Sequence, residues 1–244
     1  MPAAPDLIVA LDTPDIEVLN RLIATLSPAP VLFKSHWISF PALGFKGLKR
    51  LADETGSRLF LDFKLHDIPN TVKEATRSLL NRVPMRLMTI HALGGPAMVQ
   101  TVRQELDRYT LSVAGHDMPP APKLLAITLL TSLSVDDLHA MGLGWKSREE
   151  GVLKLATMAK ANGADGVVCT FAEAAALRRE FGNDLLLVCP GLRLEAALSQ
   201  DHAETATPQE ARELGVDYVV VGRPILNAPD PLTATEKILE QLQG

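Results

Sequence analysis

Cysteine is scarce in this chain, and there is no excess of basic charge. Only Cys169 and Cys189 occur, each inside an apolar run, and their spacing fits neither a zinc-binding motif nor a disulfide framework. We therefore expect buried structural thiols in a reduced, intracellular protein. The formal net charge of −5 argues against a nucleic-acid-binding protein, which usually carries a basic face.

Long apolar runs, linkers and low-complexity stretches are also missing. No run approaches the length of a membrane span, and residues 1–6 lack the basic and apolar regions of a signal peptide, so a cytoplasmic protein is expected. A length of 244 residues suits one α/β barrel or two small domains, and 47% of the residues are hydrophobic. Because nothing interrupts the pattern, a single domain over residues 1–244 is predicted.

Short apolar segments with strand character alternate with segments of helical spacing along the whole chain. The predicted strands are residues 7–12, 31–35, 58–65, 86–92, 123–130, 166–170, 185–190 and 218–222. The predicted helices are residues 16–26, 47–55, 71–81, 96–109, 149–162, 172–181, 208–214 and 231–242. This order predicts an α/β fold, the (β/α)8 TIM barrel. A doubly wound open sheet is the alternative, although no Gly-x-Gly-x-x-Gly follows the first strand.

Residues 58–71 combine an apolar strand with three charged side chains. Alternation along the strand places Asp62 and Lys64 on one face and a row of apolar side chains on the other. Asp67 follows in the turn, completing an Asp-x-Lys-x-x-Asp pattern at the carboxyl end of the strand. A buried Asp62–Lys64 ion pair with a purely structural role is the simpler interpretation, but such pairs stabilise poorly. The clustered charges favour a functional site.

Polar residues also end most of the other predicted strands, where barrel enzymes place their chemistry. These residues are Asp12, Lys34, His36, His91, Thr131, Arg193 and Arg223. In the last two strands a glycine accompanies the arginine, as Gly191 with Arg193 and Gly222 with Arg223. A glycine lets the backbone approach an anion and arginine offers a planar fork of donors, so these two loops indicate a phosphate site.

The motifs together resemble the orotidine 5′-phosphate decarboxylase family, of the shorter bacterial type. The matching segments, in chain order, are residues 10–12, 33–34, 61–71, 91–95, 130–132, 190–193, 207–211 and 220–225. They span nearly the whole chain. The Asp-x-Lys-x-x-Asp-Ile-Pro-x-Thr block and the Val-Gly-Arg-Pro-Ile ending are the most specific of them.

The resemblance implies decarboxylation of orotidine 5′-monophosphate to UMP, the last step of UMP synthesis, without a metal or organic cofactor. Lys64 would donate a proton to C6 of the pyrimidine, Asp62 would lie beside the substrate carboxylate, and Lys34 would complete a charged relay with Asp62, Lys64 and Asp67. Asp67 and Thr71 would reach into the neighbouring site of a homodimer.

The resemblance also implies how substrate is held. Asp12 and Lys34 would bind the ribose hydroxyls, and Thr131 would bind the pyrimidine edge. The residues implied in phosphate binding are Arg193, Gln200, Gly222 and Arg223. The two longest loops after strands, residues 132–147 and 194–205, are expected to close over the site.

Two stretches depart from the family pattern. Where the family usually continues Val-Gly after the second-strand lysine, this chain has Ser35-His36, followed by Trp37. After Arg193 the family pattern survives only at Gln200.

The sequence is also compatible with two other functions. One is a magnesium-dependent sugar-phosphate enzyme that shares the Asp-x-Lys-x-x-Asp pattern, of the hexulose-phosphate synthase or keto-gulonate-phosphate decarboxylase type. The continuation from Ile68 to Thr71 speaks against it. The other is a catalytically silent barrel that binds a nucleotide phosphate, which would be expected to lose Lys64 or an aspartate.

Overall fold

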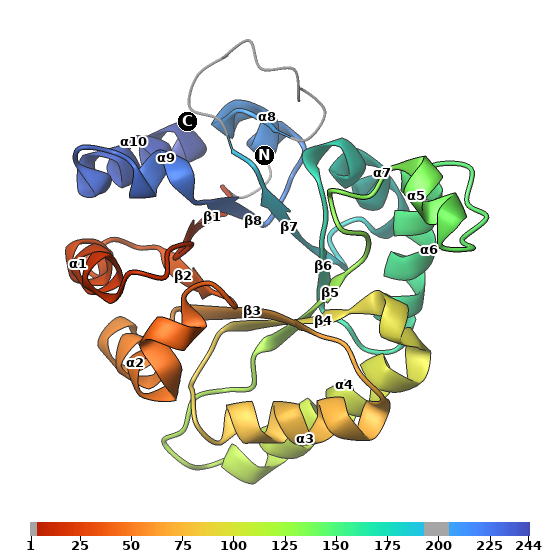
Figure 1. The fold of residues 1–244 in the computed structure, drawn as a ribbon, viewed down its shortest axis with the longest axis horizontal. Coiled ribbons are helices and arrows are strands. Elements are labelled where there is room, and N and C mark those ends of the chain that lie inside the picture. The colour runs from red at the N-terminus through yellow and green to blue at the C-terminus, as the bar shows by residue number, and fades with distance from the viewer. Residues whose placement is uncertain (1–3, 193–204) are drawn as a thin grey trace.

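The computed structural model describes residues 4–192 and 205–244, and there eight parallel strands close into a barrel (Figure 1). The strands are β1 (Asp6–Ala10), β2 (Leu32–Ser35), β3 (Leu59–Leu65), β4 (Leu87–His91), β5 (Lys123–Ile127), β6 (Gly166–Val168), β7 (Leu186–Pro190) and β8 (Tyr218–Val221). Each strand pairs with its sequence neighbours, and β1 pairs with β8 through Ile8 opposite Val220. The predicted (β/α)8 TIM barrel is confirmed.

Helices surround the strands on the outside of the barrel (Figure 1). They are α1 (Ile16–Leu26), α2 (Phe40–Thr55), α3 (Pro69–Leu80), α4 (Gly95–Val113), α5 (Val135–Ala140), α6 (Arg148–Ala161), α7 (Phe171–Phe181), α8 (Pro208–Glu213), α9 (Arg223–Leu226) and α10 (Pro231–Gln243). A short 3-10 turn, η1 (Ala92–Gly94), precedes α4. No helix in residues 4–192 or 205–244 is both long and apolar enough to cross a lipid bilayer.

Side-chain alternation divides the core into two layers. In β1, Ile8 and Ala10 belong to the cluster inside the barrel, whereas Leu7 and Val9 pack in the larger cluster that includes helix side chains. In β3, Phe60 lies in the inner cluster and Leu61 in the outer one. Parallel strands buried on both faces are expected to be apolar throughout. A charged side chain at an inward-facing position is therefore an exception, and it indicates a site at the mouth of the barrel.

The structure differs from the sequence prediction at the ends of strands and helices and in the short helices. Every predicted strand is present, most of them shortened at the carboxyl end. Helix α2 starts at Phe40, seven residues before the prediction, because it continues across a kink at Gly44, whose φ is 58°. Helices α5 and α9 were not predicted, since six and four residues are too few to show helical periodicity. The prediction of one domain over residues 1–244 stays a prediction.

Arg58, just before β3, links the end of α2 to the loop between α1 and β2. The Arg58 guanidinium donates to the backbone carbonyls of Ser27, Ala29, Val31 and Thr55. We expect Arg58→Ala to lower the free energy of unfolding by about 1–2 kcal/mol, because partly buried carbonyls lose their donors. Chemical denaturation measures this. Arg50→Ala, which removes an exposed arginine of α2, is the control and should change stability by less than about 0.5 kcal/mol.

Candidate active site

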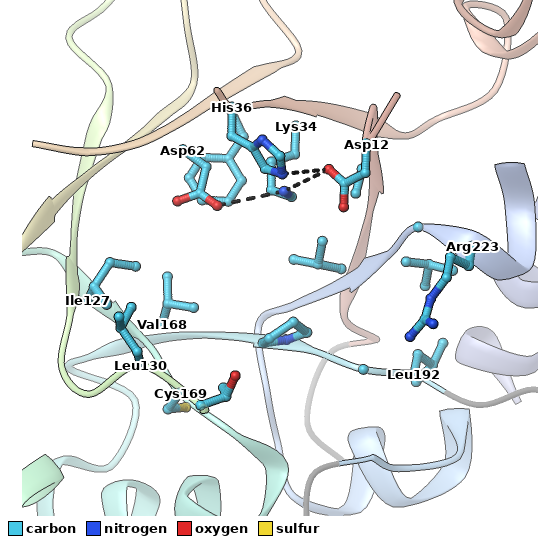
Figure 2. Close-up of a pocket in the computed structure, with 18 of the residues that line it drawn as sticks. Asp12, Lys34, His36, Asp62, Ile127, Leu130, Val168, Cys169, Leu192 and Arg223 are labelled. Atoms are coloured by element: carbon cyan, nitrogen blue, oxygen red, sulfur yellow. Dashed lines mark hydrogen bonds and ion pairs between the residues drawn. The ribbon is translucent and has the colours of Figure 1, made fainter. Parts of the chain in front are cut away.

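The carboxyl ends of the strands surround a cavity of about 990 Å³ (Figure 2). Its walls combine apolar side chains, among them Phe60, Ile127 and Val168, with a group of charged ones. The charged or polar residues that line it are Asp12, Lys34, His36, Asp62, Lys64, Thr131, Thr205 and Arg223. The mouth of the barrel thus holds most of the residues predicted from sequence.

Four charged side chains form a continuous row across β2, β3 and the loop after β1. Lys34 Nζ lies 3.2 Å from Asp12 Oδ1 and 3.7 Å from Asp62 Oδ2. Lys64 Nζ lies 2.7 Å from the same Asp62 Oδ2. The Asp62 and Lys34 side chains are only 10% and 9% exposed, so their charges are weakly screened by water. Positive and negative groups therefore alternate in the order Asp12, Lys34, Asp62, Lys64.

A hydroxyl from the neighbouring strand holds this part of β3 in place. Thr89 Oγ1 donates to Asp62 Oδ1 at 2.9 Å and accepts from the backbone N–H of Lys64 at 2.9 Å. Lys64 has a φ of 49°, a left-handed conformation that costs a non-glycine residue about 1–3 kcal/mol. The register between β3 and β4 shifts in the same place, between Leu61 and Leu65. Strain held by specific contacts at a charged cavity is typical of a functional residue.

Asp12 receives two donors on one oxygen, as Figure 2 shows. His36 Nε2 lies 2.9 Å from Asp12 Oδ1, the same atom that Lys34 approaches. Burial alone would raise the pKa of the Asp12 carboxyl, but the hydrogen bond from His36 and the charge of Lys34 outweigh it and hold the pKa below its ordinary value. Asp12 is therefore ionised at neutral pH.

The opposite wall of the cavity is formed by the ends of β7 and β8. Gly191, Gly222 and Arg223 lie there, and Thr131 lines the cavity from the loop after β5. Gly191 has a φ of 99°, which a side chain would disfavour. Arg223 is exposed and makes no ion pair within the described part of the chain. Its guanidinium is thus available to an anion.

One predicted catalytic residue, Asp67, and one predicted substrate-binding residue, Thr71, lie outside the cavity of this single chain. Asp67 is exposed, and its carboxylate accepts a hydrogen bond from the backbone N–H of Ile68. Thr71 is exposed in the first turn of α3. Neither residue lines the cavity. The relay is therefore assembled in one chain only from Lys34, Asp62 and Lys64.

Some predictions concern residues outside the described part of the chain. Arg193 and Gln200 lie outside the described residues, as does most of the expected loop 194–205. The other expected loop, 132–147, contains the short helix α5, whose first turn is capped by Ser134 and Asp137. Closure of either segment over the cavity stays a prediction.

Sequence reasoning did not place three residues, His36, Thr89 and Cys169, in the active site. His36 and Thr89 contact the charged row, and each could be suspected only as a polar side chain at the end of a strand. Cys169 lines the cavity, and its Sγ lies 3.6 Å from that of Cys189. Both thiols are buried and unoxidised, and the contact with Cys189 raises the pKa of Cys169. This agrees with the structural thiols expected from the sequence.

His91 is a buried residue beside the site rather than one that lines it. Its ring stacks on that of His66 with a centroid distance of 5.2 Å, and its Nδ1 accepts from the backbone N–H of Leu93. Burial, with the neighbouring His66 and Lys64, lowers the pKa of His91 to about 4. His91 is therefore neutral near pH 7.

Among the described residues, no three His, Cys, Asp or Glu side chains gather into a group that could hold a metal ion.

Comparison with known proteins gives a consistent result over the full length. The model of the Orotidine 5′-phosphate decarboxylase / HUMPS family matches residues 5–238. The orotidine 5′-phosphate decarboxylase of Lactobacillus acidophilus is 40% identical over 235 residues, which cover 96% of this chain and 97% of that protein. That of Nitrosococcus oceani is 39% identical over 238 residues, covering 98% and 97%. The crystal structure of the L. acidophilus enzyme superposes with a TM-score of 0.83 at 38% identity, covering 98% of this chain and 100% of that one.

Proposed function

The chain belongs to the orotidine 5′-phosphate decarboxylase / HUMPS family, and we propose that it converts orotidine 5′-monophosphate to UMP and carbon dioxide in pyrimidine biosynthesis. The observation that carries this proposal is the row of alternating charges at the barrel mouth, in a chain about 40% identical to decarboxylases over their full length. The same charges have no evident structural purpose, because buried ion pairs stabilise a fold poorly.

Lys64 is the proposed proton donor. Breaking the bond between C6 and the carboxylate leaves the electron pair on C6, in the plane of the ring, where delocalisation is poor. An ammonium placed beside C6 stabilises that charge and then transfers a proton to it, and the resulting amine regains a proton from water. Asp62, 2.7 Å from Lys64 Nζ, would aim the ammonium and lie beside the substrate carboxylate. Nothing in these steps requires a metal or an organic cofactor.

The remaining cavity residues bind substrate in this proposal. Asp12 and Lys34 would hold the ribose hydroxyls, and Thr131 would contact the pyrimidine edge. On the opposite wall, Gly222 and Arg223 would bind the phosphate, together with Arg193 and Gln200 from outside the described residues. Binding the remote phosphate supplies free energy that can hold the reacting carbon against Lys64.

We propose that the working unit is a homodimer. Asp67 and Thr71 would then enter the cavity of the partner, which agrees with their exposure in a single chain. Ile68, next to Asp67 in sequence, is 67% exposed, and Trp37 and Ile38 in the loop after β2 are 59% and 46% exposed. Large exposed apolar surface commonly marks protein interfaces.

The direct test follows the ultraviolet absorbance of orotidine 5′-monophosphate after protein is added in the presence of EDTA. We expect rapid conversion that excess magnesium does not increase. Turnover of a sugar phosphate that needs magnesium, without decarboxylation in EDTA, would assign the chain to the magnesium-dependent branch. Binding of UMP without any turnover would instead support the silent barrel.

Removal of Arg223, the proposed phosphate-binding arginine, should weaken binding of the substrate. We expect Arg223→Ala to raise KM for orotidine 5′-monophosphate by about 10- to 100-fold, the value of a charge-assisted hydrogen bond to phosphate. Inhibition by UMP should weaken equally, while inhibition by uridine, which lacks phosphate, should stay unchanged. Arg179→Ala, at an exposed position of α7, is the matched control. Equal weakening of uridine and UMP would contradict the assignment.

A further inference from the structure

His36 uses both of its ring nitrogens at the edge of the cavity. Its Nδ1 accepts a hydrogen bond from the backbone N–H of Ile38 at 3.0 Å. Its Nε2 lies 2.9 Å from Asp12 Oδ1. The side chain is 18% exposed and lines the cavity beside Asp12 and Lys34 (Figure 2). His36 belongs to the Ser35-His36 pair, where the sequence departs from the family pattern.

The contact with Ile38 determines which nitrogen carries the proton. An imidazole nitrogen that accepts a hydrogen bond from a backbone N–H has no proton of its own, so in the neutral ring the proton is on Nε2. That N–H points at Asp12. The backbone of the loop after β2 therefore orients the ring, and the ring donates to the carboxylate without needing a positive charge.

The two donors on Asp12 Oδ1 leave the other carboxylate oxygen for the cavity. Lys34 Nζ and His36 Nε2 both contact Oδ1. Oδ2 lies on the side of β8, where a side chain built at Gly222 would come within 3.5 Å of it. Oδ2 is thus turned toward the wall that holds Arg223, with a lone pair free to accept from a ligand hydroxyl.

Without His36, Lys34 alone would hold the Asp12 carboxylate less firmly than the two donors do together. Its ammonium is shared, 3.2 Å from Asp12 and 3.7 Å from Asp62. Asp12 is also open to water, with a side chain that is 37% exposed, whereas that of Lys34 is 9% exposed. A second donor on Asp12 keeps the carboxylate oriented while Lys34 stays between its two partners.

We propose that His36 is a positioning residue, which orients Asp12 so that Oδ2 accepts a hydrogen bond from a ribose hydroxyl of the substrate. The inference rests on the proposed function, and it adds a determinant of ribose recognition that acts through Asp12. His36 touches neither the base nor the phosphate in this assignment.

The test is a thermodynamic cycle between the residue and the hydroxyls. Calorimetry measures binding of UMP and of 2′,3′-dideoxyuridine 5′-monophosphate to the wild type and to His36→Leu. We expect His36→Leu to weaken UMP binding about tenfold and to change binding of the dideoxy analogue less than about twofold. In an Asp12→Ala background, His36→Leu should have no further effect on either ligand.

A conservative variant separates positioning from folding. His36→Gln keeps an N–H of similar reach and should recover most of the lost UMP affinity. Thermal unfolding of the three proteins shows whether the barrel is intact.

Each outcome is decisive. A loss confined to the ligand that carries hydroxyls, and recovered by glutamine, supports the proposal. Equal losses for both ligands, with a lower melting temperature, would mean that His36 only supports the fold and would overturn it. Absence of UMP binding in the wild type would overturn the proposed function itself, and the role of His36 with it.

Discussion

Replacing Lys64 with alanine is expected to lower kcat for orotidine 5′-monophosphate by at least about a thousandfold while UMP still binds. The lysine acts on a charge that exists only after carbon dioxide departs, so its loss raises the barrier without removing contacts to ribose or phosphate. The Lys64 ammonium contacts Asp62, and it does not belong to the opposite wall of the cavity, where Gly222 and Arg223 lie. Steady-state kinetics with a calorimetric UMP titration measure both quantities.

A lysine of the same chain that lies away from the site provides the control. Lys49 pairs with Asp53 on the surface of α2, and Lys49→Ala should leave kcat unchanged. Lys64→Arg keeps a positive charge but is a far weaker acid, so it should remain close to the alanine variant in kcat. Near-normal turnover by Lys64→Ala would remove this residue from the chemistry.

Mixing two inactive variants is expected to restore activity if Asp67 acts across the dimer. Lys64→Ala should abolish activity in the cavity of its own chain. Asp67→Ala should abolish activity in the cavity of the partner chain. In a mixed dimer, one cavity then lacks both residues and the other has both. With free exchange of equal amounts, about a quarter of the wild-type activity should return.

A second mixture provides the control. Asp62 and Lys64 lie in one cavity of one chain, 2.7 Å apart, so Asp62→Ala mixed with Lys64→Ala should recover nothing. If Asp67 instead served its own chain, the first mixture would also stay inactive. Recovery in the first mixture and not in the second would establish both the dimer and the direction in which Asp67 reaches.

Sequence alone could predict the barrel because its signal is local and repeated. Each strand is a short apolar run, and alternation along the third strand predicted that Asp62 and Lys64 share one face. Both residues line the cavity. The short helices α5 and α9 escaped prediction, because six and four residues are too few to show helical periodicity.

Spacing could not predict the contacts that organise the site. The left-handed backbone of Lys64 depends on Thr89 from the next strand, and the orientation of His36 depends on the N–H of Ile38. The two cysteines are twenty residues apart in sequence, yet their sulfur atoms lie 3.6 Å apart. Such contacts are decided by which strands become neighbours and how far each strand extends.

By itself, then, the sequence determined the architecture, the end of the barrel that carries the chemistry, and the residue types gathered there. Periodicity and strand ends encode these features locally. The tertiary structure decided the order of the charges, with Lys34 between Asp12 and Asp62, and the exposure of Asp67 outside the cavity. Those properties arise only when the barrel closes, because closure brings side chains from distant segments within reach of one another and sets how much water separates their charges.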